Sequence, residues 1–305
     1  MKGIITTFIS NDRDIKGVLL LKYNLKKIGS KYNFGCIITE DVSQESRKLL
    51  EKYKIKIFNI NLGALLHKLK FSKSHIQKIK DKHLFGKLSM FSLTEYDKVI
   101  YLDTDILLLQ NIDHLMYEKL EFNTIMMVSD IQATNDYSSI IIIKDRYNSG
   151  VIVFKPSDYL YNNCFDKLKL EGEEFFDKDI FISDQYIFES LNNDKKINIK
   201  PMSMRYNCHP ILVESLQKLK LIDDISILHY MVKPKPWELL DMNIDHVFEN
   251  KICEKLFHLW LELYLEMISN TYFNNNRLTN ITAYKNGYYS GKSLIVNNNI
   301  ITDKI

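Results

Sequence analysis

The chain has 305 residues, 46% of them hydrophobic and 26% charged, so it can bury a large core without disulfides or structural metals. Its 41 basic and 38 acidic residues leave a net charge of +3, which is too balanced to favour nucleic-acid binding by bulk electrostatics. No run approaches the roughly 18 apolar residues of a membrane span, and residues 1–14 lack the pattern of a signal peptide.

The four cysteines indicate the cellular compartment. Cys36, Cys164, Cys208 and Cys253 lie far apart and form no CxxC pair, so a zinc site is not expected. This usage suits a reducing compartment. The sequence therefore predicts a soluble, cytoplasmic protein with no membrane span and no nucleic-acid partner.

The first part of the chain alternates expected strands and helices. The expected strands cover 3–8, 34–39 and 54–60, and the expected helices cover 15–28 and 43–53. This order predicts a parallel sheet with crossover helices. Ligands bind such sheets at the carboxyl ends of the strands, where both Asn11 and Asp103 lie.

The remaining elements extend this pattern. A basic stretch over 64–82 is helix or loop, and a helix over 84–93 precedes the strand that ends at Asp103. Further elements are expected as strands at 122–128, 147–154 and 225–229, and as helices from Asp158, from Ser183 or Asp184, and over 252–268. The last helix has two open interpretations, since it could pack on its own domain or form a homodimer contact.

Two acids follow the apolar strand that begins at Lys98. Asp103 and Asp105 lie one residue apart, so as part of a strand they would face the same side and repel each other. A divalent cation resolves this repulsion, and Mg²⁺ or Mn²⁺ is usually held by carboxylates together with substrate phosphates. A surface turn, where Asp is common, is the alternative.

Three other segments carry polar side chains at predicted element ends. Asn148 and Ser149 enter a buried strand, which suits either a ligand or a turn. Asp184 and Gln185 could bind sugar hydroxyls or form a catalytic pair, or they could belong to a helix cap. The last segment, 229–237, places a His six residues before a Lys between two prolines, which suits metal and phosphate binding or a loop anchored by a tryptophan.

Taken in this order, the motifs resemble the glycogenin branch of the retaining nucleotide-sugar glycosyltransferases, glycosyltransferase family 8. The matching segments are 10–17, 87–94, 101–105, 111–113, 148–154, 184–185 and 229–237. The resemblance implies a GT-A fold, an α/β domain over 1–240 with a Rossmann-like, mostly parallel central sheet flanked by helices. Residues 241–305 would form a C-terminal helical extension and an Asn-rich tail.

The resemblance also implies the site. Mn²⁺, or Mg²⁺, would be held by Asp103, Asp105 and His229 together with the diphosphate of a UDP-sugar. The other implied donor contacts are Phe8, Ser10, Asn11 and the backbone around Thr104 for the nucleoside, Lys87 for the donor, Asn148 and Ser149 for the transferred sugar, Lys235 for the diphosphate, and Asp184 and Gln185, the catalytic pair, beside the anomeric carbon.

The chain departs from the family pattern at several positions. Asp14 replaces an aromatic Tyr, Val232 replaces a Gly, and Phe181 stands where the family has an acid. Glycogenins glucosylate their own Tyr, but no Tyr lies between Asn207 and His229. Self-priming is therefore not expected, and the acceptor should be a separate sugar or protein glycan.

The predicted function is a metal-dependent, retaining transfer of a hexose, with glucose the first choice, from a UDP-sugar. Two alternatives stay open. One is a nucleotide-sugar-binding protein without turnover, which the departures at Phe181 and Val232 favour. The other is a nucleotidyltransferase, although no Gly-rich pyrophosphate loop follows the first strand. The sequence leaves open whether retention uses a covalent intermediate or same-face attack.

Overall fold

The computed structural model describes residues 1–81, 85–133, 140–178, 183–220, 224–231, 233–241 and 251–273. It also describes the backbone of two short strands, β10 (Ile295–Val296) and β11 (Asn299–Ile300). The rest of the Asn-rich tail lies outside these residues, and so do Phe181 and Val232.

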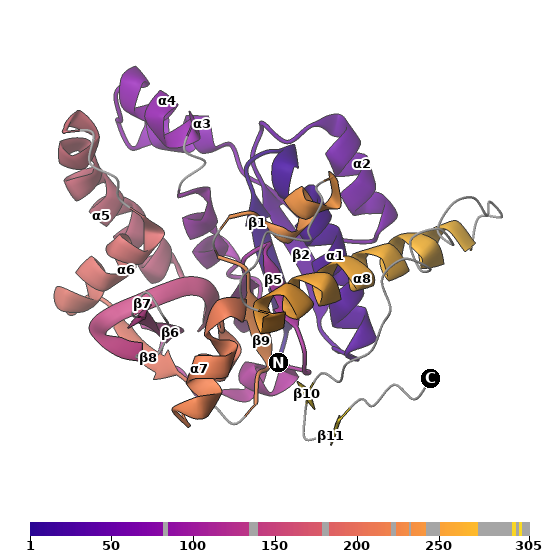
Figure 1. The fold of residues 1–305 in the computed structure, drawn as a ribbon. Helices are drawn as coiled ribbons and strands as arrows, with labels where there is room; N and C mark the ends of the chain where they lie inside the picture. Colours follow the sequence, from indigo (N-terminus) through magenta and orange to yellow (C-terminus); the bar gives the residue numbers. More distant parts are fainter. Residues whose placement is uncertain are drawn as a thin grey trace.

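A seven-stranded sheet forms the centre of the molecule, in the order β3-β2-β1-β4-β7-β6-β8 (Figure 1). Six strands share one direction, and only β7 runs antiparallel to its neighbours. The mostly parallel sheet is as predicted. Its strands are β1 (Gly3–Ile9), β2 (Asn33–Ile38), β3 (Lys56–Asn59), β4 (Lys98–Leu102), β6 (Thr124–Ala133), β7 (Ile140–Phe154) and β8 (Asn198–Met202).

Helices cover both faces of the sheet (Figure 1). One core contains side chains of α1 (Ile15–Lys27), α2 (Gln44–Lys52), α7 (Val213–Lys218) and α8 (Lys251–Phe273). The other contains side chains of α3 (Leu62–Lys68), α4 (Lys73–Asp81), α5 (Asp158–Asp177) and α6 (Asp184–Asn193). In β4, Ile100 and Leu102 enter the first core and Val99 and Tyr101 the second, because side chains alternate along a strand.

Serine caps start the helices at the predicted positions. The hydroxyl oxygens of Ser43, Ser157 and Ser183 accept hydrogen bonds from backbone N–H groups in the first turns of α2, α5 and α6. Just after α1, Gly29 adopts a φ of 72°, as expected of a glycine that ends a helix.

The expected helix over 84–93 is instead a 3₁₀ helix, η2 (Gly86–Ser92). All residues from Gly86 to Phe91 are buried, so this segment has no solvent-facing side and cannot form an amphipathic α-helix. It packs between the sheet and α5. The remaining 3₁₀ helices are η1 (Asp12–Asp14), η3 (Asp113–Tyr117), η4 (Met204–Tyr206), η5 (Pro210–Leu212) and η6 (Pro236–Asp241).

A separate pair of short strands lies next to the carboxyl end of β4. β5 (Ile106–Leu108), which the sequence did not predict, pairs antiparallel with β9 (Ile227–His229), and Ile106 lies opposite His229. Because β5 follows Asp105 directly, this pairing brings His229 to the carboxyl end of β4.

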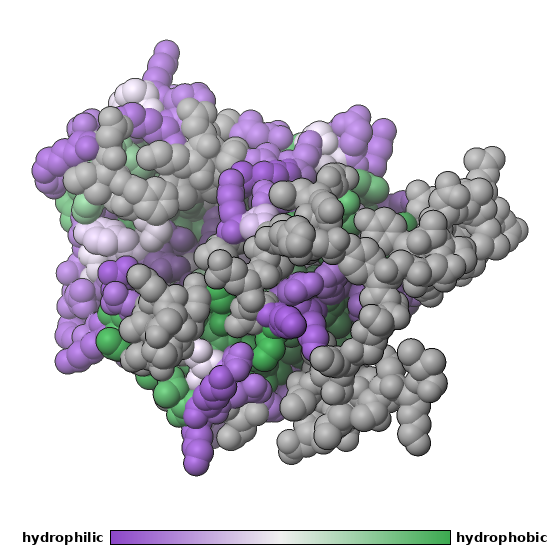
Figure 2. Space-filling view, viewed as in Figure 1, coloured by the Kyte–Doolittle hydropathy of each residue, from purple (hydrophilic) through white to green (hydrophobic). Residues whose placement is uncertain are grey.

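The C-terminal helix α8 packs on its own chain. Leu256, Phe257 and Trp260 are buried in the same core as α1. None of the helices in the described ranges combines the length and the apolar character that a membrane crossing requires. Figure 2 shows hydrophilic side chains over the α3, α4 and α5 side of the molecule, so the described part of the basic stretch, 64–79, includes solvated helix faces.

Candidate active site

A cleft of about 250 Å³, here called the charged cleft, opens at the carboxyl ends of β1 and β4. The predicted site residues that line it are Phe8, Ser10, Lys87, Asp103, Thr104, Asp105, Asp184 and Lys235. Lys233, Trp237 and Glu238 line it from the segment after β9. Parts of the chain that are far apart in sequence therefore meet at the edge where ligands bind such sheets.

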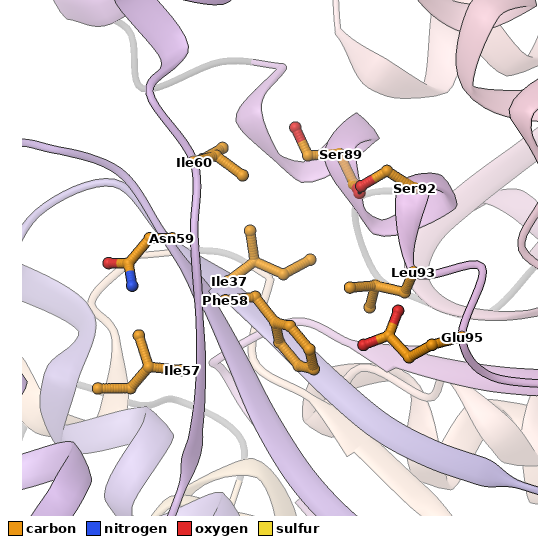
Figure 3. Close-up of a pocket in the computed structure, with 9 residues that line it drawn as sticks. All are labelled: Ile37, Ile57, Phe58, Asn59, Ile60, Ser89, Ser92, Leu93 and Glu95. Atoms are coloured by element: carbon orange, nitrogen blue, oxygen red, sulfur yellow. The ribbon is translucent and has the colours of Figure 1, made fainter.

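A second cavity, of about 310 Å³, lies at the outer edge of the sheet, between β3 and the segment around η2 (Figure 3). Phe58 and the isoleucines of β2 and β3 form much of its wall, and Glu95 is the one ionisable residue among those that line it. It contains none of the predicted site residues. Its larger volume therefore does not make it the reaction site, because the titratable groups gather in the charged cleft.

Three side chains form a candidate metal site beside the cleft. Oxygen atoms of Asp103 and Asp105 and a ring nitrogen of His229 lie within 4.8 Å of one another. His229 Nε2 lies 3.1 Å from Asp105 Oδ1 and 3.8 Å from Asp103 Oδ2. Two ligands bound at right angles to Mg²⁺ are about 3 Å apart, so these spacings fit one divalent cation with oxygen and imidazole ligands.

Each aspartate turns one oxygen toward His229 because its other oxygen is held elsewhere. Asp103 Oδ1 accepts hydrogen bonds from the Tyr101 hydroxyl at 2.8 Å and from Lys87 Nζ at 3.1 Å. Asp105 Oδ2 accepts a hydrogen bond from Lys235 Nζ. Burial raises the pKa of a carboxyl, but the interactions with His229 and Lys235 outweigh burial and hold the pKa of Asp105 well below its usual range. This carboxylate is ready to bind a cation.

A chain of hydrogen bonds orients the imidazole. His229 Nδ1 lies 2.7 Å from Asn207 Oδ1, and Asn207 Nδ2 donates to Asn148 Oδ1 at 2.6 Å. Asn148 Oδ1 also accepts from the Gly150 N–H at 2.9 Å. When Nδ1 donates to an amide oxygen, Nε2 keeps its lone pair for a metal. Asn148, predicted to face the sugar, lies in this chain rather than among the residues that line the cleft.

Gly150 lies directly beneath this imidazole, and we expect Gly150→Ala to lower metal affinity roughly 10- to 100-fold. A Cβ there would lie 2.3 Å from His229 Cε1 and 2.5 Å from Nδ1, so the ring would have to move. The loss of the free Mn²⁺ signal in electron paramagnetic resonance measures the affinity. Gly63→Ala is the control, because its Cβ would meet only the ends of two polar side chains. Equal Mn²⁺ affinity in both variants would contradict this role of Gly150.

Lys87 links the metal site to Asp184. Its Nζ lies 2.9 Å from Asp184 Oδ2 and donates to Ser149 Oγ at 3.0 Å, in addition to the bond to Asp103. Burial would lower the pKa of Lys87, but the charges of Asp103 and Asp184 raise it above the ordinary value. Burial would likewise raise the pKa of Asp184, but Lys87 and Ser149 lower it. Both groups therefore stay charged near neutral pH.

The other predicted residues lie around this centre. Asn11 Oδ1 accepts from the Arg13 N–H and caps η1, and Gln185 follows Asp184 in the first turn of α6. Asp14, which replaces the family's Tyr, lines the charged cleft, and burial together with the charge of Asp105 raises the pKa of Asp14.

Sequence reasoning missed the roles of Tyr101 and Asn207. Tyr101 precedes Asp103 by two residues, so period-two alternation could have placed both on one face. No local signal identified Asn207, whose contacts depend on the position of β9.

The comparisons with known proteins identify the family of the chain. Residues 8–240 match the model of the family described as "Glycosyl transferase family 8". The uncharacterized protein R707 of Acanthamoeba polyphaga mimivirus is 26% identical, and the match covers 85% of this chain and 92% of that protein. Human glycogenin-1 is also 26% identical, with 76% of this chain and 61% of glycogenin-1 covered.

A solved structure shows the same fold. The galactosyltransferase LgtC, in complex with donor and acceptor sugar analogues, superposes with a TM-score of 0.56 at 16% identity. The match covers 86% of this chain and 95% of LgtC. The predicted GT-A fold is confirmed.

Proposed function

Because the chain belongs to glycosyl transferase family 8, we propose that this glycosyltransferase transfers a hexose, with glucose as the first choice, from a UDP-sugar with retention of configuration. The observation that carries this proposal is the convergence of Asp103, Asp105 and His229 with Lys235 and the Lys87–Asp184 pair at one cleft. These groups supply opposite charges to the two ends of a breaking sugar–phosphate bond.

Lys235 and Asp184 have complementary roles in this proposal. Negative charge develops on the departing diphosphate, and Lys235 stabilises it as a fixed point charge. Positive charge develops at the anomeric carbon, and the ionised Asp184 stabilises this charge. Lys87 lies between Asp184 and Asp103 of the metal site. A Mn²⁺ or Mg²⁺ ion held by Asp103, Asp105 and His229 would neutralise further diphosphate charge as a Lewis acid.

The acceptor in this proposal is a separate molecule, a sugar or a protein glycan. No Tyr lies between Asn207 and His229, where self-glucosylation would need one. The donor and acceptor analogues bound to LgtC support two separate substrates for a protein of this fold. The four cysteines are buried and form no disulfide with one another, which supports a reducing compartment and hence a cytoplasmic placement. A homodimer stays a prediction that light scattering after gel filtration would check.

The experiment is a screen of nucleotide sugars for hydrolysis, read as nucleoside diphosphate released with and without Mn²⁺. We expect UDP-glucose, or another UDP-hexose, to be hydrolysed slowly with Mn²⁺ and not after chelation by EDTA, since water replaces the missing acceptor. Calorimetry on the same panel measures binding independently of turnover.

Each outcome of this screen separates the candidates. Release of UDP that depends on Mn²⁺ supports the transferase. Tight binding of a UDP-sugar with no release, even with saccharide acceptors added, would favour the nucleotide-sugar-binding protein. Release of a nucleoside monophosphate would indicate a nucleotidyltransferase and overturn the proposal.

A further inference from the structure

The two tryptophans of the chain, Trp237 and Trp260, contact each other at the edge of the charged cleft. Their ring centroids are 5.8 Å apart, and the planes are tilted by 51°. Trp237 lines the cleft, whereas Trp260 is fully buried in α8 and stacks on Tyr264 at 5.3 Å. Aromatic pairs at such distances stabilise each other beyond the area that they bury. The position of Trp237 therefore depends on α8.

The same turn of α8 holds the chain just after β9. The hydroxyl of Tyr230 donates to the carbonyl oxygen of Leu256 at 2.6 Å. The Tyr230 ring packs edge-on against Phe257, with the centroids 4.8 Å apart. Residues 256–260 of α8 thus contact two anchor residues, Tyr230 and Trp237.

Lys235 lies between these two anchors. Its Nζ donates to the carbonyl oxygen of Tyr230 at 2.9 Å and forms the ion pair with Asp105. Its backbone N–H donates to Glu238 Oε2 at 2.7 Å. The Lys235 ammonium, which faces the metal site, is therefore hydrogen-bonded to the anchor Tyr230. The other anchor, Trp237, follows Lys235 by two residues.

Helix α1 also lies close to Trp237. A Cβ on Gly17 would lie 2.9 Å from Trp237 Cζ3 and 2.4 Å from the carbonyl oxygen of Thr104, so only glycine permits this approach. Helix α8 is bonded to α1, since Glu266 accepts hydrogen bonds from Tyr23 at 2.7 Å and from Lys27 at 2.6 Å. Trp237 thus contacts two helices that are hydrogen-bonded to each other.

We propose that α8, which lies beyond the residues matched by the family model, is a functional part of the donor site: Trp260 is a positioning residue that seats Trp237 and so places Lys235 against the donor diphosphate. The inference rests on the proposed function in that Lys235 is taken to meet a diphosphate. It assigns to α8 a role in donor affinity in addition to its role in the core.

The test compares UDP affinity, measured by calorimetry with Mn²⁺, among matched variants. Trp260→Leu is expected to weaken UDP binding roughly tenfold. Because Trp260 acts through Lys235, the double variant Trp260→Leu, Lys235→Ala should bind UDP no more weakly than Lys235→Ala alone. Met267→Ala is the control, since Met267 is buried in the same core two turns further along α8. It should lower the melting temperature and leave UDP affinity unchanged.

A conservative variant and the intrinsic fluorescence cover the case in which Trp260→Leu does not fold. Trp260→Phe keeps an aromatic contact and should retain most of the UDP affinity. Its single remaining tryptophan, Trp237, should change its emission during a UDP titration, with the midpoint that calorimetry gives.

The outcomes separate this inference from the proposed function. If the unmodified protein does not bind UDP with Mn²⁺, the proposed function is wrong, and the role of Trp260 is overturned with it. If the unmodified protein binds UDP, but Trp260→Leu and Met267→Ala lose stability alike with no loss of affinity, only the inference about α8 is wrong. A UDP titration of Trp260→Phe that leaves Trp237 emission constant counts against it too.

Discussion

Asp103→Asn is expected to reduce Mn²⁺-dependent donor turnover about 10³-fold while the protein stays folded. In the unmodified protein, Tyr101 and Lys87 donate hydrogen bonds to Asp103 Oδ1. In the variant, the amide oxygen can still accept both of them. The amide NH₂ must then point toward His229, where Asp103 Oδ2 lies now. An NH₂ group offers no lone pair to a cation, so metal binding is lost without an unsatisfied buried group. The release of UDP from a UDP-hexose measures the turnover.

The matched control for Asp103→Asn is Glu118→Gln. Glu118 is a partly exposed acid paired with Lys200 at 3.1 Å, and it does not line the charged cleft. Its neutralisation changes the net charge by the same amount and should leave turnover unchanged, because such surface pairs contribute little. Full activity of Asp103→Asn in the presence of Mn²⁺ would show that the assignment of the metal site is wrong.

Asp184→Asn is expected to slow sugar transfer by about 10²- to 10³-fold while UDP affinity changes little. The carboxylate acts on charge at the anomeric carbon of the transferred sugar, and UDP lacks that sugar. Lys87 keeps Asp103 and Ser149 as partners, so the variant should fold. Calorimetry with UDP and Mn²⁺, together with the transfer rate at saturating donor, separates binding from chemistry.

The loss of transfer rate in Asp184→Asn is expected to be independent of pH near neutrality. Lys87 and Ser149 hold the pKa of Asp184 below the ordinary aspartate value, so this side chain stays a carboxylate throughout the neutral and mildly acid range. The deficit of Asp184→Asn should therefore be the same at about pH 6 and about pH 8.

Glu189→Gln is the control for Asp184→Asn, because Glu189 lies on the same helix but contacts Arg146 and the Tyr147 N–H instead of the cleft. Its transfer rate should match that of the unmodified protein. If Asp184→Asn weakened UDP binding as much as it slowed transfer, Asp184 would be a donor-binding group rather than a stabiliser of charge at the sugar.

Local patterns in the sequence determined most elements of the fold and one part of the site. Apolar runs, helical periodicity and serine caps depend on neighbours within a few residues, and they predicted β1, β2, β4 and the starts of α2, α5 and α6. The two acids after β4 were visible for the same reason, since a carboxylate at the end of a buried strand needs a partner.

Only the tertiary structure decided which partner each of these groups has. The short strand β5 carries no clear pattern, yet its pairing with β9 brings His229 to Asp105, and Lys235 reaches Asp105 from 130 residues away. Likewise, Tyr101 orients the Asp103 carboxylate, and Asn207 orients the His229 imidazole. Helix α8 positions Trp237 through a ring contact. The sequence by itself determined which groups carry charge and where most of the strands and helices lie. Their distances and orientations were decided by the packing of distant elements, because no local periodicity encodes which buried surfaces meet.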